Sequence, residues 1–310
     1  MMKEYKKPEL LVTAKNLTEV DQLLSAGADA LELGGNGYGL RSSGEFSLEM
    51  IKEALDLAHS RQAKIYVAVN AILHNEALTG LAEYLSKLAE YRVDAVIYGD
   101  PAVLVTAQQS APDLPLHLSS ETVSTNVQTL NYWAEKGVKR GYLSRELSLE
   151  EVFFIKQRAN IEVQILIHGA TCIFHSKREL ISNYREFLWE NSKLDVQYPE
   201  QAKLYLLESQ RPTEKYPIFE DRHGSHIMNS QDICMIDHLK EFVDAGIDSL
   251  KIDGLLHTTE YLIQVTQMYR RALDQAVNTS LTDGFIDEIR KIQPENRPLG
   301  TGFYFKEQIY

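Results

Sequence analysis

Residues 161–184, IEVQILIHGATCIFHSKRELISNY, place two histidines and a cysteine directly after an apolar run. The first seven residues are rich in β-branched side chains, which is typical of a strand buried on both faces. We expect this strand to stop at the HGA sequence of residues 168–170, because glycine permits a tight turn. His168, Cys172 and His175 would then lie in the loop at its carboxyl end, where α/β proteins usually carry their chemistry.

These residue types allow more than one chemistry. Cys172 could be a nucleophile that is paired with His168 or His175, as in a cysteine hydrolase. Equally, His168 could be a hydrogen-bonded rim histidine and Cys172 a small buried apolar residue. A zinc site would need distant ligands, because His168 and His175 do not have the HExxH spacing. No GxSxG sequence of a serine hydrolase is present. The residues alone leave the first two alternatives open.

Composition narrows the class of protein. The 310 residues are 44% hydrophobic and 25% charged, which are ordinary values for a soluble chain with a large core. No apolar run approaches the ~20 residues that span a bilayer, and MMKEYKKPEL lacks the apolar region of a secretory signal. Only Cys172 and Cys234 are present, which argues against a disulfide framework. We therefore expect a cytoplasmic protein with no membrane partner.

Strand-like and helix-like segments alternate along most of the chain. The expected strands cover residues 8–14, 28–35, 63–71, 95–100, 115–121, 138–144, the run from 161, and 247–253. A segment with helical spacing follows each of them, and after the seventh strand it comes only at residues 236–245, beyond an interruption. Eight such units predict an α/β fold of the TIM type, a (β/α)8 barrel. An open doubly wound sheet is the alternative, but no GxGxxG sequence follows the first strand.

Residues 170–235 interrupt this alternation. They are polar, rich in Tyr, His and Pro, and poor in helical periodicity. Within them, LYLLES and KYPIFEDRHGSHIM look like β-hairpin sequences. We expect an inserted, partly β lid in the seventh βα loop rather than a separate domain. The barrel would then cover residues 1–279 with the insertion 170–235, and residues 280–310 would form a C-terminal cap that packs on the barrel.

Polar residues recur where the expected strands end, and in a barrel these ends share one face. The catalytic candidates at this face are His168, Cys172, Glu121 and Glu146. The substrate-binding candidates are Arg41, Asn70, His117, Ser119, Arg145, Lys251 and Asp253. A rim network of ion pairs is the alternative, in which Arg145 and Lys251 balance the carboxylates.

Eight segments together resemble the U32 peptidase family, also called collagenase-like proteases. They are GADALELGGNGYGLRSS (27–43), VAVNAILHNEAL (67–78), HLSSETVSTN (117–126), LSRELSLEE (143–151), IHGATC (167–172), LISNY (180–184), SQDICMIDHLKEFVDAGIDSLKIDG (230–254) and NRPLGTGF (296–303). The resemblance covers nearly the whole chain, and it agrees with the barrel that the alternation predicts.

The resemblance implies two kinds of activity. The family is named for peptidase activity, so one alternative is a collagenase-like hydrolase that uses Cys172 with His168 or a bound metal. Other members hydroxylate ribosomal cytidine or the wobble uridine of tRNA, and short barrel-only members are implicated in forming 5-hydroxyuridine. We expect the second role, tRNA hydroxylation, because the sequence contains no recognisable set of nucleophile, base and orienting group.

The tRNA-modifying branch of the family is linked to an iron–sulfur cluster, and its cysteine pattern is incomplete here. Cys172 matches the first ligand and Cys234 the last. Lys177 stands at the pattern's glycine, Glu179 at its second cysteine, and the third cysteine is absent. Because four thiolates usually hold such a cluster, we expect this chain alone to bind none. A single metal ion on His168, Cys172 and a carboxylate is an alternative.

The candidate residues also predict a ligand and partners. Arg145, His168 and Lys251 would bind a small anionic ligand, because arginine offers a planar fork for carboxylates and lysine adds a point charge. The resemblance suggests prephenate, and a peptide terminus is the alternative. The formal net charge of −12 predicts weak, salt-sensitive tRNA binding by this chain alone. We therefore expect this chain to contact tRNA as part of a complex with a larger protein of the same family. Homo- or hetero-oligomers both remain open.

Overall fold

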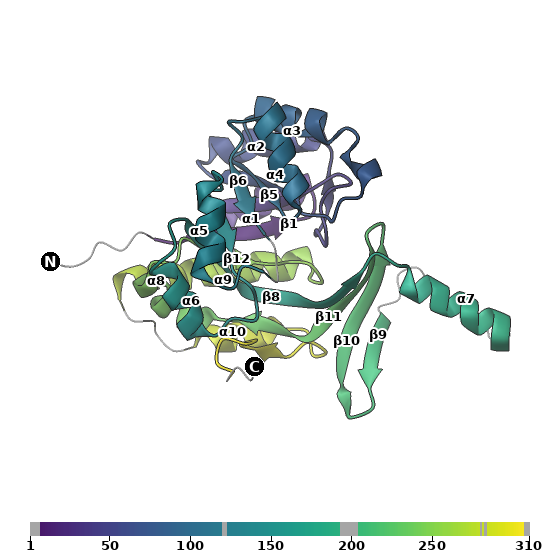
Figure 1. Ribbon diagram of the computed structural model, residues 1–310. Helices are drawn as coiled ribbons and strands as arrows, with labels where there is room; N and C mark the ends of the chain where they lie inside the picture. The colour runs from purple at the N-terminus through teal and green to yellow at the C-terminus, as the bar shows by residue number, and fades with distance from the viewer. Residues whose placement is uncertain (1–6, 120–122, 193–203, 280, 282–283, 307–310) are drawn as a thin grey trace. The chain divides into compact units, whose positions relative to one another are not determined.

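The structure, a computed structural model, describes residues 7–119, 123–192, 204–279, 281 and 284–306. Strands and helices alternate along the first half of the chain as expected (Figure 1). None of the helices in these ranges is both long and apolar enough to cross a bilayer.

Eight strands of the described chain run parallel and close into a barrel. In the order of their pairing they are β1 (Glu9–Ala14), β2 (Ala30–Gly35), β4 (Lys64–Val69), β5 (Ala95–Tyr98), β6 (Leu116–Leu118), β7 (Arg140–Tyr142), β8 (Glu162–Ser176) and β12 (Ser249–Ile252). Strand β12 pairs with both β8 and β1, which closes the ring. The predicted TIM-type barrel is therefore confirmed, and the open sheet is excluded.

Helices connect these strands. They are α1 (Leu17–Ser25), α2 (Leu48–Ser60), α3 (Leu81–Glu90), α4 (Pro101–Ser110), α5 (Val127–Glu135), α6 (Leu149–Lys156), α8 (Leu239–Ala245) and α9 (Thr259–Asn278), with the short elements β3 (Glu45–Phe46), η1 (Asn75–Leu78) and η2 (Ile236–His238). Local sequence sets where several of them begin. Ser47 caps α2, and Ser148 with Glu151 forms the expected capping box at α6.

The seventh barrel strand does not stop where the sequence predicted a turn. Strand β8 continues through residues 168–170 to Ser176, and it pairs with β11 (Gly224–Cys234). Gly169 has a φ of +109°, and a Cβ at this position would lie 2.2 Å from the carbonyl oxygen of Asp253. Glycine is therefore required here, but it allows a bend within a strand rather than ending it.

The chain divides into two compact units. The barrel unit takes in the described residues of Met1–Gly169, Ile233–Ile292 and Thr301–Tyr310, and the sheet unit takes in those of Ala170–Asp232 and Gln293–Gly300. The predicted role of residues 170–235 as a lid over the barrel mouth stays a prediction, as do the predicted domain boundaries.

The sheet unit contains the predicted hairpin strands. Strand β10 (Arg211–Asp221) pairs antiparallel with both β9 (Leu204–Glu208) and β11. Although this region is poor in helical periodicity, it also contains a helix, α7 (Leu180–Ser192), which begins just after β8. Most of the apolar residues of α7 are exposed rather than buried against the strands.

The end of the chain contributes to both units. Helix α10 (Phe285–Ile292) belongs to the barrel unit, whereas β13 (Leu299–Gly300) pairs with β11 in the sheet unit. The buried Arg297 makes ion pairs with Asp232 inside the sheet unit. Tyr304 returns to the barrel unit, where its hydroxyl donates to the carbonyl oxygen of Leu166 over 2.7 Å.

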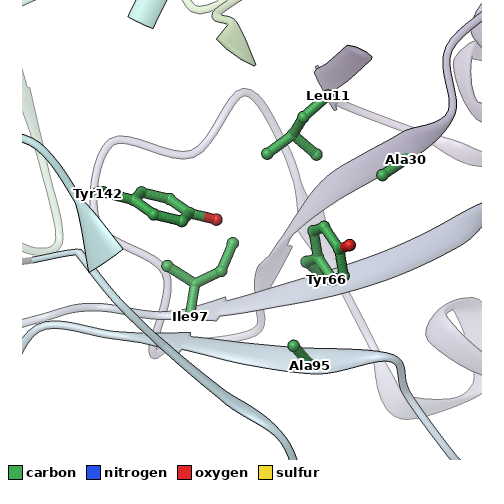
Figure 2. Packing of buried hydrophobic residues seen from close by; sticks show 6 residues of the cluster. All are labelled: Leu11, Ala30, Tyr66, Ala95, Ile97 and Tyr142. Carbon is green, nitrogen blue, oxygen red and sulfur yellow. The ribbon is translucent and has the colours of Figure 1, made fainter. Parts of the chain in front are cut away.

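Small and large side chains alternate inside the barrel. The cluster in Figure 2 comes from five different strands and consists of Leu11, Ala30, Tyr66, Ala95, Ile97 and Tyr142. Alanines beside large side chains allow such a layer to pack within the limited space of a closed barrel.

A buried ion pair joins strands on two sides of this interior. The guanidinium of Arg140 donates to Glu9 over 2.5 Å and to Glu162 over 2.8 Å, and its side chain is only 4% exposed. The hydroxyl of Tyr66 also donates to Glu9 over 2.7 Å. Burial by itself would raise the pKa of Glu9. The charge and hydrogen bonds of Arg140, with Tyr66 and Lys64, outweigh burial and hold that pKa below its ordinary value of 4.5.

We expect Arg140→Met to lower the free energy of unfolding by about 3–5 kcal/mol, because it leaves the Glu9 carboxylate buried without its partner. Because the folded pKa of Glu9 is lowered, its contribution is present above the unfolded pKa and is lost as the pH falls through the folded value. Urea unfolding at neutral and acidic pH measures both effects. Glu9→Gln in the Arg140→Met background should recover part of the loss. An unchanged urea midpoint for Arg140→Met would contradict the assignment.

Candidate functional site

One lysine and two carboxylates meet at the carboxyl end of the barrel strands. Nζ of Lys251, on β12, lies 2.8 Å from Oε2 of Glu32 on β2 and 3.5 Å from Oδ2 of Asp253. The Lys251 and Glu32 side chains are 15% and 10% exposed, so water screens this pair only in part. The ammonium group of Lys251 is thus shared between two carboxylates. An anionic ligand would therefore have to draw the ammonium away from Glu32.

Neutral polar groups surround this cluster. The hydroxyl oxygen of Thr13 on β1 accepts a hydrogen bond from the backbone N–H of Gly254 over 2.7 Å and another from Ser43 over 3.1 Å. These bonds fasten the loops after β12 and β2 to β1. Burial, and then the nearby charge of Glu32, raise the pKa of Tyr142, which keeps its hydroxyl protonated at neutral pH. The site thus offers an ammonium, carboxylates and hydroxyls for a polar ligand.

His168 is held between two tyrosines of α9. Its side chain is fully buried, with Nε2 2.8 Å from the Tyr261 hydroxyl and Nδ1 3.3 Å from the Tyr269 hydroxyl. The Tyr269 hydroxyl also donates to the carbonyl oxygen of Ile167 over 2.9 Å. A histidine with both ring nitrogens engaged and no exposed surface suits the positioning of α9 against β8. This geometry does not favour His168 as a base that meets substrate.

The two cysteines are both buried thiols. Sγ of Cys234 lies 3.7 Å from the Tyr269 hydroxyl, and burial raises the pKa of the Cys234 thiol. Cys172 belongs to the sheet unit, where its thiol donates to the carbonyl oxygen of Phe174 over 3.1 Å. With Lys177 and Glu179 in the other positions of the pattern, these residues do not fit a four-thiolate iron–sulfur cluster. Within the described residues, no three His, Cys, Asp or Glu side chains are grouped as metal ligands.

Three other candidates lie in loops of the barrel unit. Asn70, just after β4, accepts a hydrogen bond from the backbone N–H of Leu40 over 2.8 Å and so shapes the loop after β2. Arg41 follows in that loop, half-buried and with a φ of +50°. Ser119 is half-buried after β6, and its N–H donates to the carbonyl oxygen of Tyr98. These residues organise the loops, and a ligand-binding role remains a prediction.

Arg145 and Glu146 follow β7, the first half-buried and the second exposed. Glu121 lies outside the described residues. The structure therefore supplies a position for two of these three candidates, and their predicted roles in binding and catalysis stay predictions.

His117 lies deeper than the sequence suggested. It pairs in register with Arg140, the first residue of β7, and its ring centre is 4.7 Å from that of Tyr66. Burial, then the positive charges of Arg140 and Lys64, lower its pKa well below the ordinary value. His117 is therefore a neutral histidine of the barrel interior and not a residue of the carboxyl-end rim.

Sequence reasoning did not single out the three tyrosines of this site. Alternation along β7 could have marked Tyr142 as facing inward. Tyr261 and Tyr269 are eight residues apart, which places them on the same face of α9. Nothing in the sequence indicates that this face meets His168, because about a hundred residues separate them.

Residues 15–309 match the family described as peptidase family U32. The chain belongs to that family. This confirms the resemblance carried by the eight sequence segments, over nearly the whole chain.

Two relatives and one solved structure illustrate the similarity. tRNA hydroxylation protein P2 of Bacillus subtilis (strain 168) is 49% identical over 310 residues, which cover 98% of this chain and 100% of the relative. tRNA hydroxylation protein P1 of the same organism is 32% identical over 315 residues, or 98% of this chain and 74% of the relative. The U32 peptidase Mk0906 has a TM-score of 0.50 at 14% identity, over 82% of this chain and 95% of that one, and supports the fold alone.

The burial of Cys234 predicts slow thiol chemistry. We expect iodoacetamide to alkylate Cys234 in the native protein about a hundredfold more slowly than in the urea-unfolded chain, since modification requires local opening. Peptide mass spectrometry after timed quenching measures the rate for each cysteine. The exposed Ser60→Cys variant provides a matched reactive thiol in the same folded protein. Native Cys234 that reacts as fast as this control would contradict the described environment.

Proposed function

We propose that this chain takes part in tRNA hydroxylation, forming 5-hydroxyuridine at the wobble position together with a longer member of its family. The observation that carries the proposal is the 49% identity to tRNA hydroxylation protein P2, which extends over the full length of both chains. Similarity at this level and coverage includes the whole barrel and the sheet unit. The compartment that fits this role is the cytoplasm.

The proposed partner is a longer paralogue that resembles tRNA hydroxylation protein P1. Bacillus subtilis has both a protein of this length and the longer one, of which this chain matches 74%. A net charge of −12 suits a chain that meets tRNA beside a second protein better than one that binds tRNA alone. The proposal assigns no iron–sulfur cluster to this chain, because its thiols are too few, and leaves that chemistry to the partner.

The carboxyl end of the barrel is the proposed ligand site. Lys251, Glu32 and Asp253 form a fixed polar cluster there, and the neutral hydroxyl of Tyr142 is close enough to Glu32 to be affected by its charge. We include prephenate, the small anion that the family resemblance suggests, as the candidate ligand, with Arg145 supplying its cation. Arginine suits a dicarboxylate because its planar fork can bind two oxygens at once.

The peptidase alternative finds less support in the geometry. His168 has both ring nitrogens occupied by tyrosines, and the Cys172 thiol donates to a backbone carbonyl. A cysteine hydrolase needs a thiol that is hydrogen-bonded to its base. Neither described cysteine has such a histidine partner among the hydrogen bonds of the described residues.

Deletion of the gene should lower the 5-hydroxyuridine content of tRNA and of the nucleosides derived from it. Mass spectrometry of tRNA nucleosides from the deletion strain and its parent measures this, in cells that lack other routes to the modification. A plasmid copy should restore the content. Lys251→Met should restore it about tenfold less well, because it removes the ammonium group that Glu32 and Asp253 share. The exposed Lys291→Met is the matched control. Undiminished 5-hydroxyuridine in the deletion strain would refute the proposed function.

Prephenate should raise the unfolding temperature of the purified protein if the proposed ligand is right. At a hundred times its Kd, a ligand stabilises the folded state by about 2.7 kcal/mol. Arg145→Ala should abolish this shift, because it removes the proposed carboxylate fork. Arg158→Ala, at an exposed arginine near the end of α6, should keep it. A shift that survives in Arg145→Ala would place the ligand elsewhere.

A further inference from the structure

Helix α7 is fastened to the sheet unit at its first turn. Oε1 of Glu220, on β10, accepts a hydrogen bond from the backbone N–H of Ile181 over 3.0 Å, and Oε2 accepts from that of Ser182 over 3.1 Å. The buried Ser225 donates to Glu220 over 2.6 Å and accepts from the backbone N–H of Leu180 over 2.8 Å. The carboxylate of Glu220, on β10, thus caps the first turn of α7, and its negative charge complements the positive end of the helix dipole.

Beyond this first turn, the helix leaves its apolar side exposed. Figure 1 shows α7 extending away from β10 and β11, the strands that anchor it. One stripe of the helix, at spacings of three and four residues, consists of Leu180, Ile181, Tyr184, Phe187 and Leu188. Tyr184 is 62% exposed, Phe187 58% and Leu180 39%. A stripe of this width normally faces a protein core, so its exposure marks a docking surface.

The residue types of the stripe indicate a helix as the occupant. The stripe combines aliphatic leucine and isoleucine with aromatic side chains, which suits packing against another apolar helix. Nucleic-acid surfaces instead combine aromatic residues with a clear excess of basic ones. Around α7, the basic Lys177, Arg178 and Arg185 are matched by acidic residues, so this surface has no such excess.

The two ends of α7 differ in the charge of their exposed residues. The basic Lys177 and Arg178 precede the first turn, which Glu220 caps, and the acidic Glu190 lies in the last turn. An antiparallel partner with the same sequence brings Arg178 of each copy to Glu190 of the other, so the two ends are complementary in charge.

We propose that the apolar stripe of α7 binds α7 of a second copy of this chain, as an antiparallel two-fold pair. With the axis near Tyr184, Leu180 of each copy faces Leu188 of the other, and Arg178 lies near the other copy's Glu190. Such an isologous contact is self-complementary and closes at two subunits. A 13-residue helix is about 20 Å long. The pair is therefore smaller than a standard interface, and the dimer dissociates on dilution.

Sedimentation velocity of the purified full chain over a wide concentration range tests the proposal. The wild type should shift from monomer to dimer as concentration rises. Tyr184→Glu should raise the dimer Kd by about tenfold or more, because it puts a charge on the axis. Val105→Glu, at a 52% exposed position of α4, is the matched control and should dimerise like the wild type. Circular dichroism of each variant checks that the exposed substitutions leave the fold intact.

A charge-reversal cycle tests the antiparallel register separately. Arg178→Glu and Glu190→Arg should each weaken the dimer, and the double variant should regain most of the lost affinity. Glu53→Arg, at an exposed position of α2, controls for the change in net charge. A wild type that stays monomeric at every concentration would overturn the proposal, even if α7 then bound RNA or a different protein. A dimer unaffected by Tyr184→Glu, or a double variant without recovery, would overturn it too.

Discussion

The close approach of Gly169 to Asp253 is the constraint on which the architecture of this protein depends. The carbonyl oxygen of His168 accepts a hydrogen bond from the N–H of Asp253 over 2.9 Å, which joins the ends of β8 and β12 and helps to close the barrel. At the next residue, any side chain would collide with the Asp253 carbonyl. Glycine therefore lets one strand finish the barrel and continue, without interruption, into the second unit. The same contact sets the position of Asp253 beside Lys251, and so the geometry of the candidate site.

Charged side chains form two layers in the barrel interior, one near the start of the strands and one near their carboxyl ends. Near the start of the strands, Arg140 is enclosed by Glu9 and Glu162, and every charge has a partner. Near their carboxyl ends, the ammonium group of Lys251 is shared by Glu32 and Asp253. The first layer is suited to stability, since its charges are compensated. The second layer combines these charged side chains with the hydroxyls of Thr13 and Tyr142, and it is the layer to which we assign the proposed ligand.

The sheet unit is organised around hydrogen bonds that hold one helix, α7. Its strands are paired with one another and hold the first turn of α7 through Glu220 and Ser225. The helix is thus oriented by hydrogen bonds at its first turn, while its own apolar stripe contributes little to the stability of the isolated chain. An oriented helix with an exposed apolar face is prepared for association, because little conformational entropy remains to be lost when a partner binds.

The sequence by itself determined the barrel, its eight strands and the family, because the alternation of buried strands and capped helices is local and repeats along the chain. It also located Lys251 and Asp253 near one another, since both end the same strand. Only the tertiary structure decided the surroundings of the His168, His117 and Cys234 side chains. Their environments depend on Tyr269, Arg140 and other residues about twenty to a hundred positions away, and no local pattern encodes those contacts. The continuation of β8 beyond Gly169 was likewise decided by pairing with β11, because a glycine permits a turn and a bent strand equally well.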